Sequence, residues 1–240
     1  MKISLSILEY EQSLYNEMEF PFKSEIFSRI IDLINTGRVD SIHIDIMRPP
    51  LIPNRIVFPL RLIRELYEAL HERIPLSFHL MVPDPLLMIK NMDEFIPKVD
   101  RADNTMIIQR ESFNSEDKML DAISLLRKRG YNKIGVCLDL PTPCRSVSEK
   151  SVEAADFILL MTVHMGRGRQ RYSDAGTEKI RYFSRRYPNK PLWVDGGINI
   201  QTAQIAKRAG ADTLVVGSFI TLNDDPVYAL IRLAQSVNDI

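Results

Sequence analysis

Short apolar segments alternate with longer amphipathic segments along the whole chain, and this alternation limits the folds open to it. Segments with strand character lie near residues 3–8, 40–47, 75–81, 104–109, 133–138, 156–162, 191–195 and 212–217. Segments with helical periodicity follow near residues 24–36, 58–72, 85–95, 115–129, 145–153, 174–187, 200–208 and 225–237. Strands that alternate with helices are typical of a parallel sheet. Eight such pairs within 240 residues predict an α/β protein, a single (β/α)8 TIM barrel spanning residues 1–240.

A doubly wound open sheet is the other common fold with this alternation. That fold more often has fewer strands, and a glycine-rich turn follows its first strand. Here the first predicted strand continues into Glu9, Tyr10, Glu11 and Gln12 instead. No shift in composition, charge run or low-complexity linker marks a second domain. We therefore expect one barrel domain.

Composition and charge disfavour several classes of partner. The 31 lysine and arginine residues balance 31 aspartate and glutamate residues, which gives no reason to expect binding to nucleic acid or to a membrane surface. No stretch approaches the roughly 18 apolar residues of a membrane-spanning helix, and the apolar run at the N-terminus is too short for a signal peptide. Cys137 and Cys144 are too few for a disulfide framework. We expect a soluble cytoplasmic protein.

The segment 41–47 has two unlike faces. Because side chains alternate along a strand, its isoleucines point to one side and its remaining side chains to the other. The second face carries Ser41, His43, Asp45 and Met47. A half-exposed strand of a surface sheet would explain this alternation equally well. A histidine and a carboxylate directed into a barrel would instead indicate a functional site.

Further polar side chains stand where later strands end. His79 and Met81 share one face at the end of the third predicted strand, and Asp195 ends the seventh. Barrel enzymes build their active sites at the carboxyl ends of the strands, so we expect His43, Asp45, His79 and Asp195 to converge. Two imidazoles and two carboxylates can bind a divalent ion such as zinc, manganese, iron or cobalt. A satisfied core histidine or a capping aspartate explains any one of these residues, but hardly all four.

These residues belong to a longer, ordered set of short blocks. The blocks are Lys2–Leu8, His43–Met47, Pro53–Asn54, His79–Met81, Thr142–Pro143, Met161–Val163, Gly166, Gly168, Gln170, Val194–Ile198 and Gly217–Ser218. Each block alone is weak, but the ordered set spans nearly the whole chain. On these blocks the chain resembles the ribulose-phosphate 3-epimerase family, metal-dependent barrels that interconvert ribulose 5-phosphate and xylulose 5-phosphate.

The resemblance implies an isomerase and a role for each matching residue. Asp45 and Asp195 match the family's acid/base pair, which works through an enediolate, and these aspartates also hold one divalent metal ion together with His43 and His79. The matching substrate-binding residues are Ser6, Met47, Met81, Met161, Gly166, Gly168 and Gln170. Methionines more often fill the core than contact a substrate, and Ser6 could equally be a minor polar residue of the core. The implied partner is a small-molecule ketose phosphate, and the family's members are often homo-oligomers.

Glycines after the last two predicted strands suggest where the phosphate of such a substrate would bind. Gly196 and Gly197 follow the seventh strand, and Gly217 and Ser218 follow the eighth. Barrels commonly bind phosphate through bare backbone amides at these positions. Tight turns alone would also explain the glycines. Together with the loop 166–170 they favour a phosphate site.

Several positions depart from the family pattern. Arg48-Pro49-Pro50 stands where the family usually has an Asp-Gly pair. Gln109 stands two residues before Glu111, where the family usually has a histidine. The segment 10–23 is longer than usual and could be a lid or a subunit contact. The loop after the sixth strand is strongly basic and carries Arg167, Arg169 and Arg171.

The predicted metal ligands match the family, but the loops around the substrate do not. The identity of the substrate therefore stays open. One alternative is a 3-epimerase of a hexulose 6-phosphate such as D-allulose 6-phosphate, or of a ketose with a second anionic group near Arg48 or Arg167. Another is a non-catalytic sugar-phosphate-binding barrel. Related barrels that form or cleave hexulose phosphates use an Asp-x-Lys-x-x-Asp strand. This chain has no lysine from 24 to 89, which disfavours an aldol or decarboxylase activity.

Overall fold

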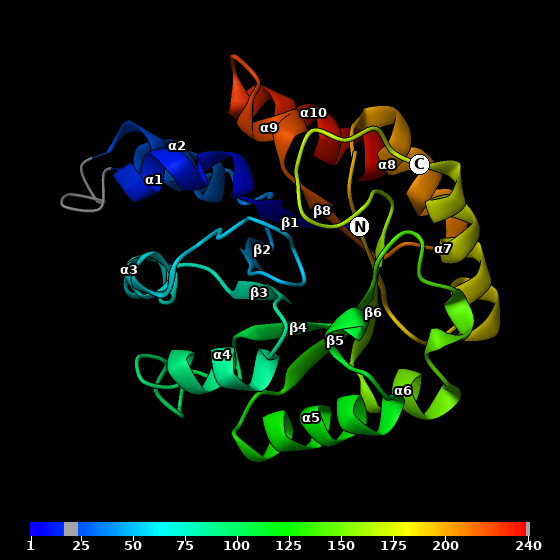
Figure 1. Ribbon diagram of the computed structural model, residues 1–240. Helices are drawn as coiled ribbons and strands as arrows, with labels where there is room; N and C mark the ends of the chain where they lie inside the picture. The colour runs from blue at the N-terminus through cyan, green and yellow to red at the C-terminus, as the bar shows by residue number, and fades with distance from the viewer. Residues whose placement is uncertain (17–23, 239–240) are drawn as a thin grey trace.

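The computed structural model describes residues 1–16 and 24–238. Its strands form one closed parallel barrel in sequence order, in which β8 pairs back onto β1 (Figure 1). The strands are β1 (Lys2–Ser6), β2 (Ser41–Met47), β3 (Leu76–Met81), β4 (Thr105–Gln109), β5 (Lys133–Leu138), β6 (Phe157–Met161), β7 (Leu192–Asp195) and β8 (Thr213–Val216). Each strand lies within two residues of its predicted segment, and the predicted (β/α)8 barrel is confirmed.

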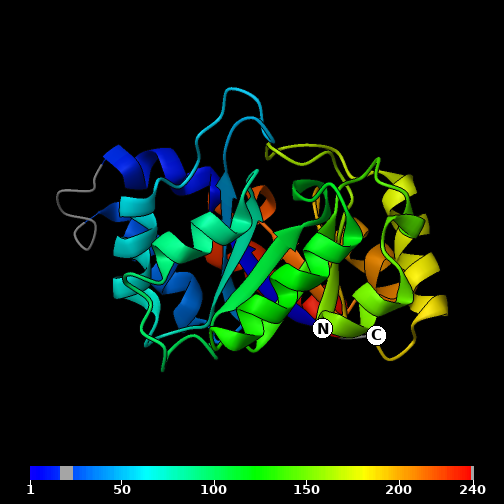
Figure 2. The same cartoon turned by 60° about the horizontal axis from the view of Figure 1, so that its bottom comes forward.

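Helices cover the outside of this barrel (Figures 1 and 2). The predicted ones are α2 (Glu25–Asn35), α3 (Leu60–Leu70), α4 (Pro85–Met92), α5 (Glu116–Lys128), α6 (Glu149–Ala154), α7 (Asp174–Arg186), α8 (Ile200–Ala209) and α10 (Pro226–Asn238). The sequence did not reveal η1 (Leu8–Tyr10), α1 (Glu11–Asn16), η3 (Arg110–Ser112), η4 (Cys144–Ser146) and α9 (Ser218–Thr221). Over the described ranges, no helix is long and apolar enough to cross a membrane.

The longer segment after β1 is only partly described. Residues 10–16 complete η1 and form α1, and they place Tyr10 and Leu14 in the buried core, with 4% and 0% exposure. Residues 17–23 lie outside the described residues. A lid or a subunit contact formed by this segment therefore stays a prediction.

Strand β2 is buried along its whole length, which makes the surface-sheet interpretation of its alternation wrong. Its three isoleucines belong to the main hydrophobic core, as expected for β-branched side chains on a pleated strand. His43 and Asp45, on the other face, are 0% and 4% exposed. The parallel register with β3 sets Asp45 opposite His79 and Met47 opposite Met81. The two strands thus bring their polar residues to one level of the barrel.

Three aspartates tie neighbouring strands together at the amino ends of the barrel. Asp40, directly before β2, accepts the backbone N–H of Ile3 on β1 at 2.8 Å and donates its own N–H to the Ile3 carbonyl at 2.8 Å. Asp156 and Asp212 repeat this reciprocal arrangement with the starts of β5 and β7. Because this end lies opposite the carboxyl ends of the strands, we assign these bonds to stability and register.

Candidate active site

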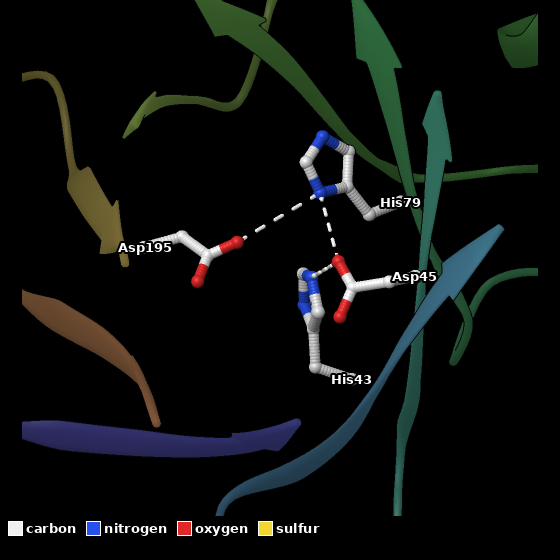
Figure 3. Close-up of side chains that lie close together, drawn as sticks. All are labelled: His43, Asp45, His79 and Asp195. Atoms are coloured by element: carbon white, nitrogen blue, oxygen red, sulfur yellow. Dashed lines mark ion pairs between the residues drawn. The ribbon is translucent and has the colours of Figure 1, made fainter. Parts of the chain in front are cut away.

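Four polar side chains meet inside the carboxyl end of the barrel (Figure 3). His43 and Asp45 come from β2, His79 from β3 and Asp195 from the end of β7. Asp45 Oδ1 lies 3.2 Å from His43 Nε2 and 3.3 Å from His79 Nδ1, and Asp195 Oδ2 lies 4.0 Å from His79 Nδ1. One potential ligand atom of each residue lies within 4.8 Å of the others. The structure therefore brings together all four residues predicted to ligate a metal.

The outer nitrogen of each imidazole has a hydrogen-bonding partner. His43 Nδ1 lies 2.9 Å from Ser77 Oγ, and His79 Nε2 lies 2.8 Å from Gln109 Oε1. Both rings are completely buried. Ser77 lies on the same face of β3 as His79, so strand alternation offered a signal for it. Nothing in the sequence indicated that Gln109 would meet His79.

The inner nitrogens, His43 Nε2 and His79 Nδ1, have no hydrogen-bond partner among residues 1–16 and 24–238. Unpaired buried polar atoms are rare in folded proteins and call for an explanation. Here the two atoms face the carboxylates of Asp45 and Asp195 (Figure 3). Two imidazole nitrogens and two carboxylates suit a divalent transition metal, and their outer partners resemble the hydrogen bonds that orient metal ligands. The residues present thus fit a divalent ion.

The two carboxylates have opposite electrostatic surroundings. Burial alone would raise the pKa of Asp45, but the adjacent imidazoles of His43 and His79 lower it well below its usual range. Ser6 Oγ also donates a hydrogen bond to Asp45 Oδ2 at 2.8 Å. Burial and the charge of Asp45 raise the pKa of Asp195 to about 6. Environments that separate the pKa values of two carboxyl groups are typical of acid/base pairs.

A pocket opens above this cluster at the carboxyl ends of the strands. It is lined by Ser6, Asp45, Met47, Met81, Met161, Gly166, Gly168, Gln170, Asp195, Gly196, Gly197, Gly217 and Ser218, all predicted as site residues. His43 and His79 lie behind this surface as fully buried side chains. Arg167 and Arg169 of the basic loop also line the pocket, together with Glu9, which sequence reasoning did not single out.

Close packing requires glycine at some positions of the pocket rim and not at others. Gly196 and Gly197 have φ values of 116° and 61°, and a Cβ at either would collide with Val163 or Tyr172. Close packing therefore explains both. At Gly217 a Cβ would only make an ordinary contact with Ser6, at 3.4 Å, so packing does not require glycine there. Its half-buried backbone lines the pocket and remains a candidate for contact with a ligand.

The loops after β2 and β6 touch each other at Gly166, on the rim of the pocket. Figure 2 shows the loop after β2 rising above the barrel toward the loop after β6. Arg55 Nη1 donates a hydrogen bond to the Gly166 carbonyl, and Ile52 packs against the same glycine. Arg48 donates to the carbonyls of Met47, Val57 and Phe58 at 2.6 to 2.8 Å. Arg48 is therefore committed to holding the β2 loop together and does not line the pocket.

The basic loop after β6 is bonded within itself and to η1. Gln170 Nε2 donates to the carbonyls of His164 and Arg167 at 2.6 and 2.9 Å. Arg169 Nε pairs with Glu9 Oε2 at 2.8 Å. Gly168 has no Cβ where the Glu9 carboxylate packs. Gln170 and Gly168 thus shape the pocket wall as well as lining it.

Comparison with curated proteins identifies related enzymes over most of the chain. A Bacillus subtilis protein named ribulose-phosphate 3-epimerase is 31% identical over 212 residues, covering 85% of this chain and 89% of its own. The cytoplasmic isoform of ribulose-phosphate 3-epimerase from Oryza sativa is 30% identical and covers 82% of each chain. The ribulose-phosphate 3-epimerase of Methanocaldococcus jannaschii is also 30% identical, covering 82% of this chain and 80% of its own.

Solved structures share the architecture at lower identity. The 3-hexulose-6-phosphate synthase of Salmonella typhimurium aligns over 100% of this chain and 99% of its own, with a TM-score of 0.64 and 18% identity. The protein KGPDC from Streptococcus mutans aligns over 99% of this chain and 97% of its own, with a TM-score of 0.64 and 13% identity. These likenesses show the fold alone.

The match to a family pattern covers most of the barrel. The sequence model of the ribulose-phosphate 3 epimerase family matches residues 24–221. That range contains β2 to β8 and all four clustered side chains. It agrees with the relatives of 30% and 31% identity, whose matches cover most of the chain. The chain therefore belongs to the ribulose-phosphate 3-epimerase family of sugar-phosphate isomerases.

Proposed function

We propose that this protein epimerises a ketose phosphate at C3 in a metal-dependent reaction, and that its substrate pair is D-ribulose 5-phosphate and D-xylulose 5-phosphate. The observation that carries the proposal is the cluster of His43, Asp45, His79 and Asp195, whose two inner imidazole nitrogens lack hydrogen-bond partners in the described part of the chain. Relatives named for this epimerisation, about 30% identical, support the substrate.

The metal would be held by His43 Nε2, His79 Nδ1 and the carboxylates of Asp45 and Asp195. When bound, a divalent ion supplies positive charge that polarises the ketone and stabilises the negative charge of the enediolate. The donor set suits zinc, manganese, iron or cobalt and does not choose among them. The hydrogen bonds from Ser77 and Gln109 would keep both imidazoles oriented.

The two aspartates are suited to opposite halves of one proton exchange. Asp45 belongs to β2 and Asp195 to β7, so they approach the pocket from different sides of the barrel. One carboxylate removes the proton at C3 and leaves an enediolate, and the other carboxyl group returns a proton to the opposite face of C3. General acid–base transfer of this kind contributes about 10²- to 10⁴-fold to the rate.

The remaining pocket residues would position the sugar phosphate. Met47, Met81 and Met161 would form an apolar floor, and Ser6 would meet a substrate hydroxyl. Gly166, Gly168 and Gln170 would close the side wall. The phosphate would bind between the β7 and β8 ends, at Gly196, Gly197, Gly217 and Ser218. Arg167, in the same pocket wall, would add favourable charge for an anion, whereas Arg169 is already paired with Glu9.

A hexulose 6-phosphate such as D-allulose 6-phosphate is the second candidate substrate. The loops after β2 and β6 depart from the family pattern and touch at Gly166 on the pocket rim, which favours considering it. A second anionic group at Arg48 is disfavoured because that guanidinium is bonded to three backbone carbonyls. A non-catalytic barrel is disfavoured because the chain belongs to a family of enzymes and keeps all four ligand-type residues of the cluster.

Steady-state kinetics on metal-reconstituted protein test the proposed substrate. We expect kcat/KM for D-ribulose 5-phosphate to exceed that for D-allulose 6-phosphate, and stripping the metal should abolish turnover of either. A higher kcat/KM for the hexulose would replace the proposed substrate by the second candidate.

We further propose that the protein is a cytoplasmic homo-oligomer. The cytoplasmic location is in keeping with the relative named as a cytoplasmic isoform. Size-exclusion chromatography with light scattering tests the assembly.

A further inference from the structure

Gln109 lies behind His79 at the end of β4 and connects it to Glu111. Gln109 Oε1 is 2.8 Å from His79 Nε2, and Gln109 Nε2 is 2.6 Å from Glu111 Oε2. His79 and Gln109 are both completely buried. Neither Gln109 nor Glu111 lines the substrate pocket. The three side chains form one hydrogen-bonded chain that ends at the proposed metal site.

The Glu111 carboxylate decides which way the Gln109 amide points. An ionised carboxylate only accepts hydrogen bonds. Glu111 Oε1 accepts the backbone N–H of Asp139 at 3.0 Å and also the hydroxyl of Thr142. Glu111 Oε2 must then accept from the amide NH2 of Gln109, which turns the amide oxygen toward His79. The choice between amide oxygen and nitrogen is therefore fixed by chemistry here.

An amide oxygen facing His79 Nε2 requires a proton on that nitrogen. The Nδ1 atom then keeps its lone pair, and it lies 3.3 Å from Asp45 Oδ1 and 4.0 Å from Asp195 Oδ2. The other imidazole is less constrained, because His43 Nδ1 faces the hydroxyl of Ser77, which can either donate or accept. The Gln109–Glu111 pair thus makes one of the two imidazoles a preset metal ligand.

We propose that Glu111, acting through Gln109, is a positioning residue that fixes His79 with its proton on Nε2 and its Nδ1 lone pair directed into the metal site. The inference deepens the proposed function and rests on its metal site. It gives a role to the glutamine that stands where the family usually has a histidine. Outer partners of metal-binding histidines typically alter metal affinity by about 10- to 100-fold.

Replacing Glu111→Gln should reverse the amide chain. The backbone N–H of Asp139 can only donate, so it keeps the amide oxygen of the new Gln side chain at position 111. The NH2 group of that side chain then faces Gln109. Gln109 must then turn its own NH2 toward His79 Nε2, which favours a proton on Nδ1 where the metal should bind. We expect the affinity for Zn²⁺, measured by competition with a chelating dye, to fall by about 10- to 100-fold. In metal-free, ¹⁵N-histidine-labelled protein, the hydrogen-bonded Nε2–H resonance of His79 should be lost.

The double variant Gln109→Glu/Glu111→Gln should restore both readouts. It contains the same two side-chain types in exchanged positions. The carboxylate at position 109 would accept from His79 Nε2–H and from the amide at position 111, so the ring regains the same tautomer. Zinc affinity should return close to the wild-type value, together with the Nε2–H resonance. A role limited to packing would not be rescued by this exchange.

Ser112→Ala is the matched control. Ser112 lies in the same 3₁₀ turn but donates to the Val82 carbonyl, so zinc affinity should be unchanged. Thermal unfolding checks that each variant folds. Wild-type zinc affinity in Glu111→Gln, or a double variant no better than the single one, would overturn this inference alone. A wild-type protein that binds no zinc would overturn the proposed metal site, and this inference with it.

Discussion

Asp45 and Asp195 show how one residue type can take two roles in a single cluster. Asp45 lies against both imidazoles and accepts a hydrogen bond from Ser6, so its charged form is stabilised. Asp195 is buried near that charge, so its protonated form is favoured relative to an ordinary aspartate. The difference arises from contacts across β1, β2, β3 and β7, and it suits a reaction in which one group takes a proton and another returns one.

Asp195→Asn should remove one member of the acid/base pair and leave the barrel folded. Because an amide cannot exchange the proton, we expect kcat to fall by about 10²- to 10⁴-fold. Coupled-enzyme assays with ribulose 5-phosphate measure the loss, and circular dichroism checks the fold. Asp224→Asn, an exposed residue outside the pocket, is the control. Near-normal turnover by Asp195→Asn would refute the assignment.

Ser6→Ala should weaken catalysis by releasing Asp45. The lost hydrogen bond, 2.8 Å to a buried carboxylate, is charge-assisted and corresponds to roughly a tenfold or larger drop in kcat/KM. Ser4→Ala on the same strand removes a hydrogen bond to Ser41 that does not reach the cluster, and it should leave kcat/KM unchanged. Equal effects of the two substitutions on kcat/KM would show that the Ser6 bond has no special role.

At this scale the sequence predicted the four ligand-type side chains but not their partners. Strand alternation and strand ends were enough to place His43, Asp45, His79 and Asp195 at one mouth. The contact of Gln109 with His79 depends on how β3 and β4 are staggered, which a single sequence does not reveal. Arg48 donates to three backbone carbonyls because of the path its loop takes, and the sequence does not reveal that path. From its residue type alone, Arg48 was expected to bind an anion.

Helix α8 illustrates how an element boundary is set beside the pocket. Asn199 accepts hydrogen bonds from the backbone N–H groups of Gln201 and Thr202 at 2.9 and 3.0 Å. The Thr202 hydroxyl in turn accepts the Asn199 N–H at 2.8 Å. This reciprocal capping box starts the helix directly after the Gly196–Gly197 turn. The Thr202 hydroxyl also donates to the Gly197 carbonyl at 3.0 Å, which links the helix start to the pocket rim.

Asn199→Ala should lower the free energy of unfolding by about 1 kcal/mol, because two backbone N–H groups lose their acceptor. Urea denaturation followed by circular dichroism measures the change. Asn199→Ser, which can still cap the helix, should recover most of it. If the alanine and serine variants are equally stable, the cap does not contribute as proposed.

Elements with clear periodicity were predictable, and short ones were not. The strands among the described residues lie within two residues of their predicted segments, because each apolar run stands out from the amphipathic segments around it. The start of α6 was predicted near 145 but lies at Glu149, since Cys144–Ser146 forms a separate turn. The one-turn helix α9 and the six-residue helix α1 are too short for a periodic signal.

Bonds at the end of the barrel opposite the active site join neighbouring strands. Asp40, Asp156 and Asp212 each bond reciprocally to the start of a neighbouring strand. Barrel geometry separates such stabilising residues, at the amino ends, from catalytic residues at the carboxyl ends. Substitutions at the two ends should therefore have separable effects.

Asp40→Ala should destabilise the fold without changing the chemistry. The Ile3 N–H loses a charged acceptor, which corresponds to about 1 to 2 kcal/mol of unfolding free energy. Chemical denaturation measures the loss, and kcat/KM at 25 °C should match the wild type. Asp32→Ala, on the exposed side of α2, is the control. A large fall in kcat/KM with unchanged stability would contradict this division.

Closure of the barrel could be predicted from the number of strand–helix pairs, because so many parallel strands in one short chain favour a closed sheet. The contact between the β2 and β6 loops at the pocket rim could not be predicted. That contact joins Arg55 to the Gly166 carbonyl across more than a hundred residues, and no local pattern encodes it. The substrate-facing walls are for this reason the part that sequence reasoning described least well.

Proton exchange with solvent at C3 tests the central claim most directly. Metal-reconstituted protein is incubated with D-ribulose 5-phosphate in D2O, and the products are analysed by NMR. We expect deuterium at C3 of the xylulose 5-phosphate formed, with no exchange at C4 and none in metal-stripped protein. Absence of xylulose 5-phosphate and of C3 deuterium from the fully metal-loaded protein would contradict the account.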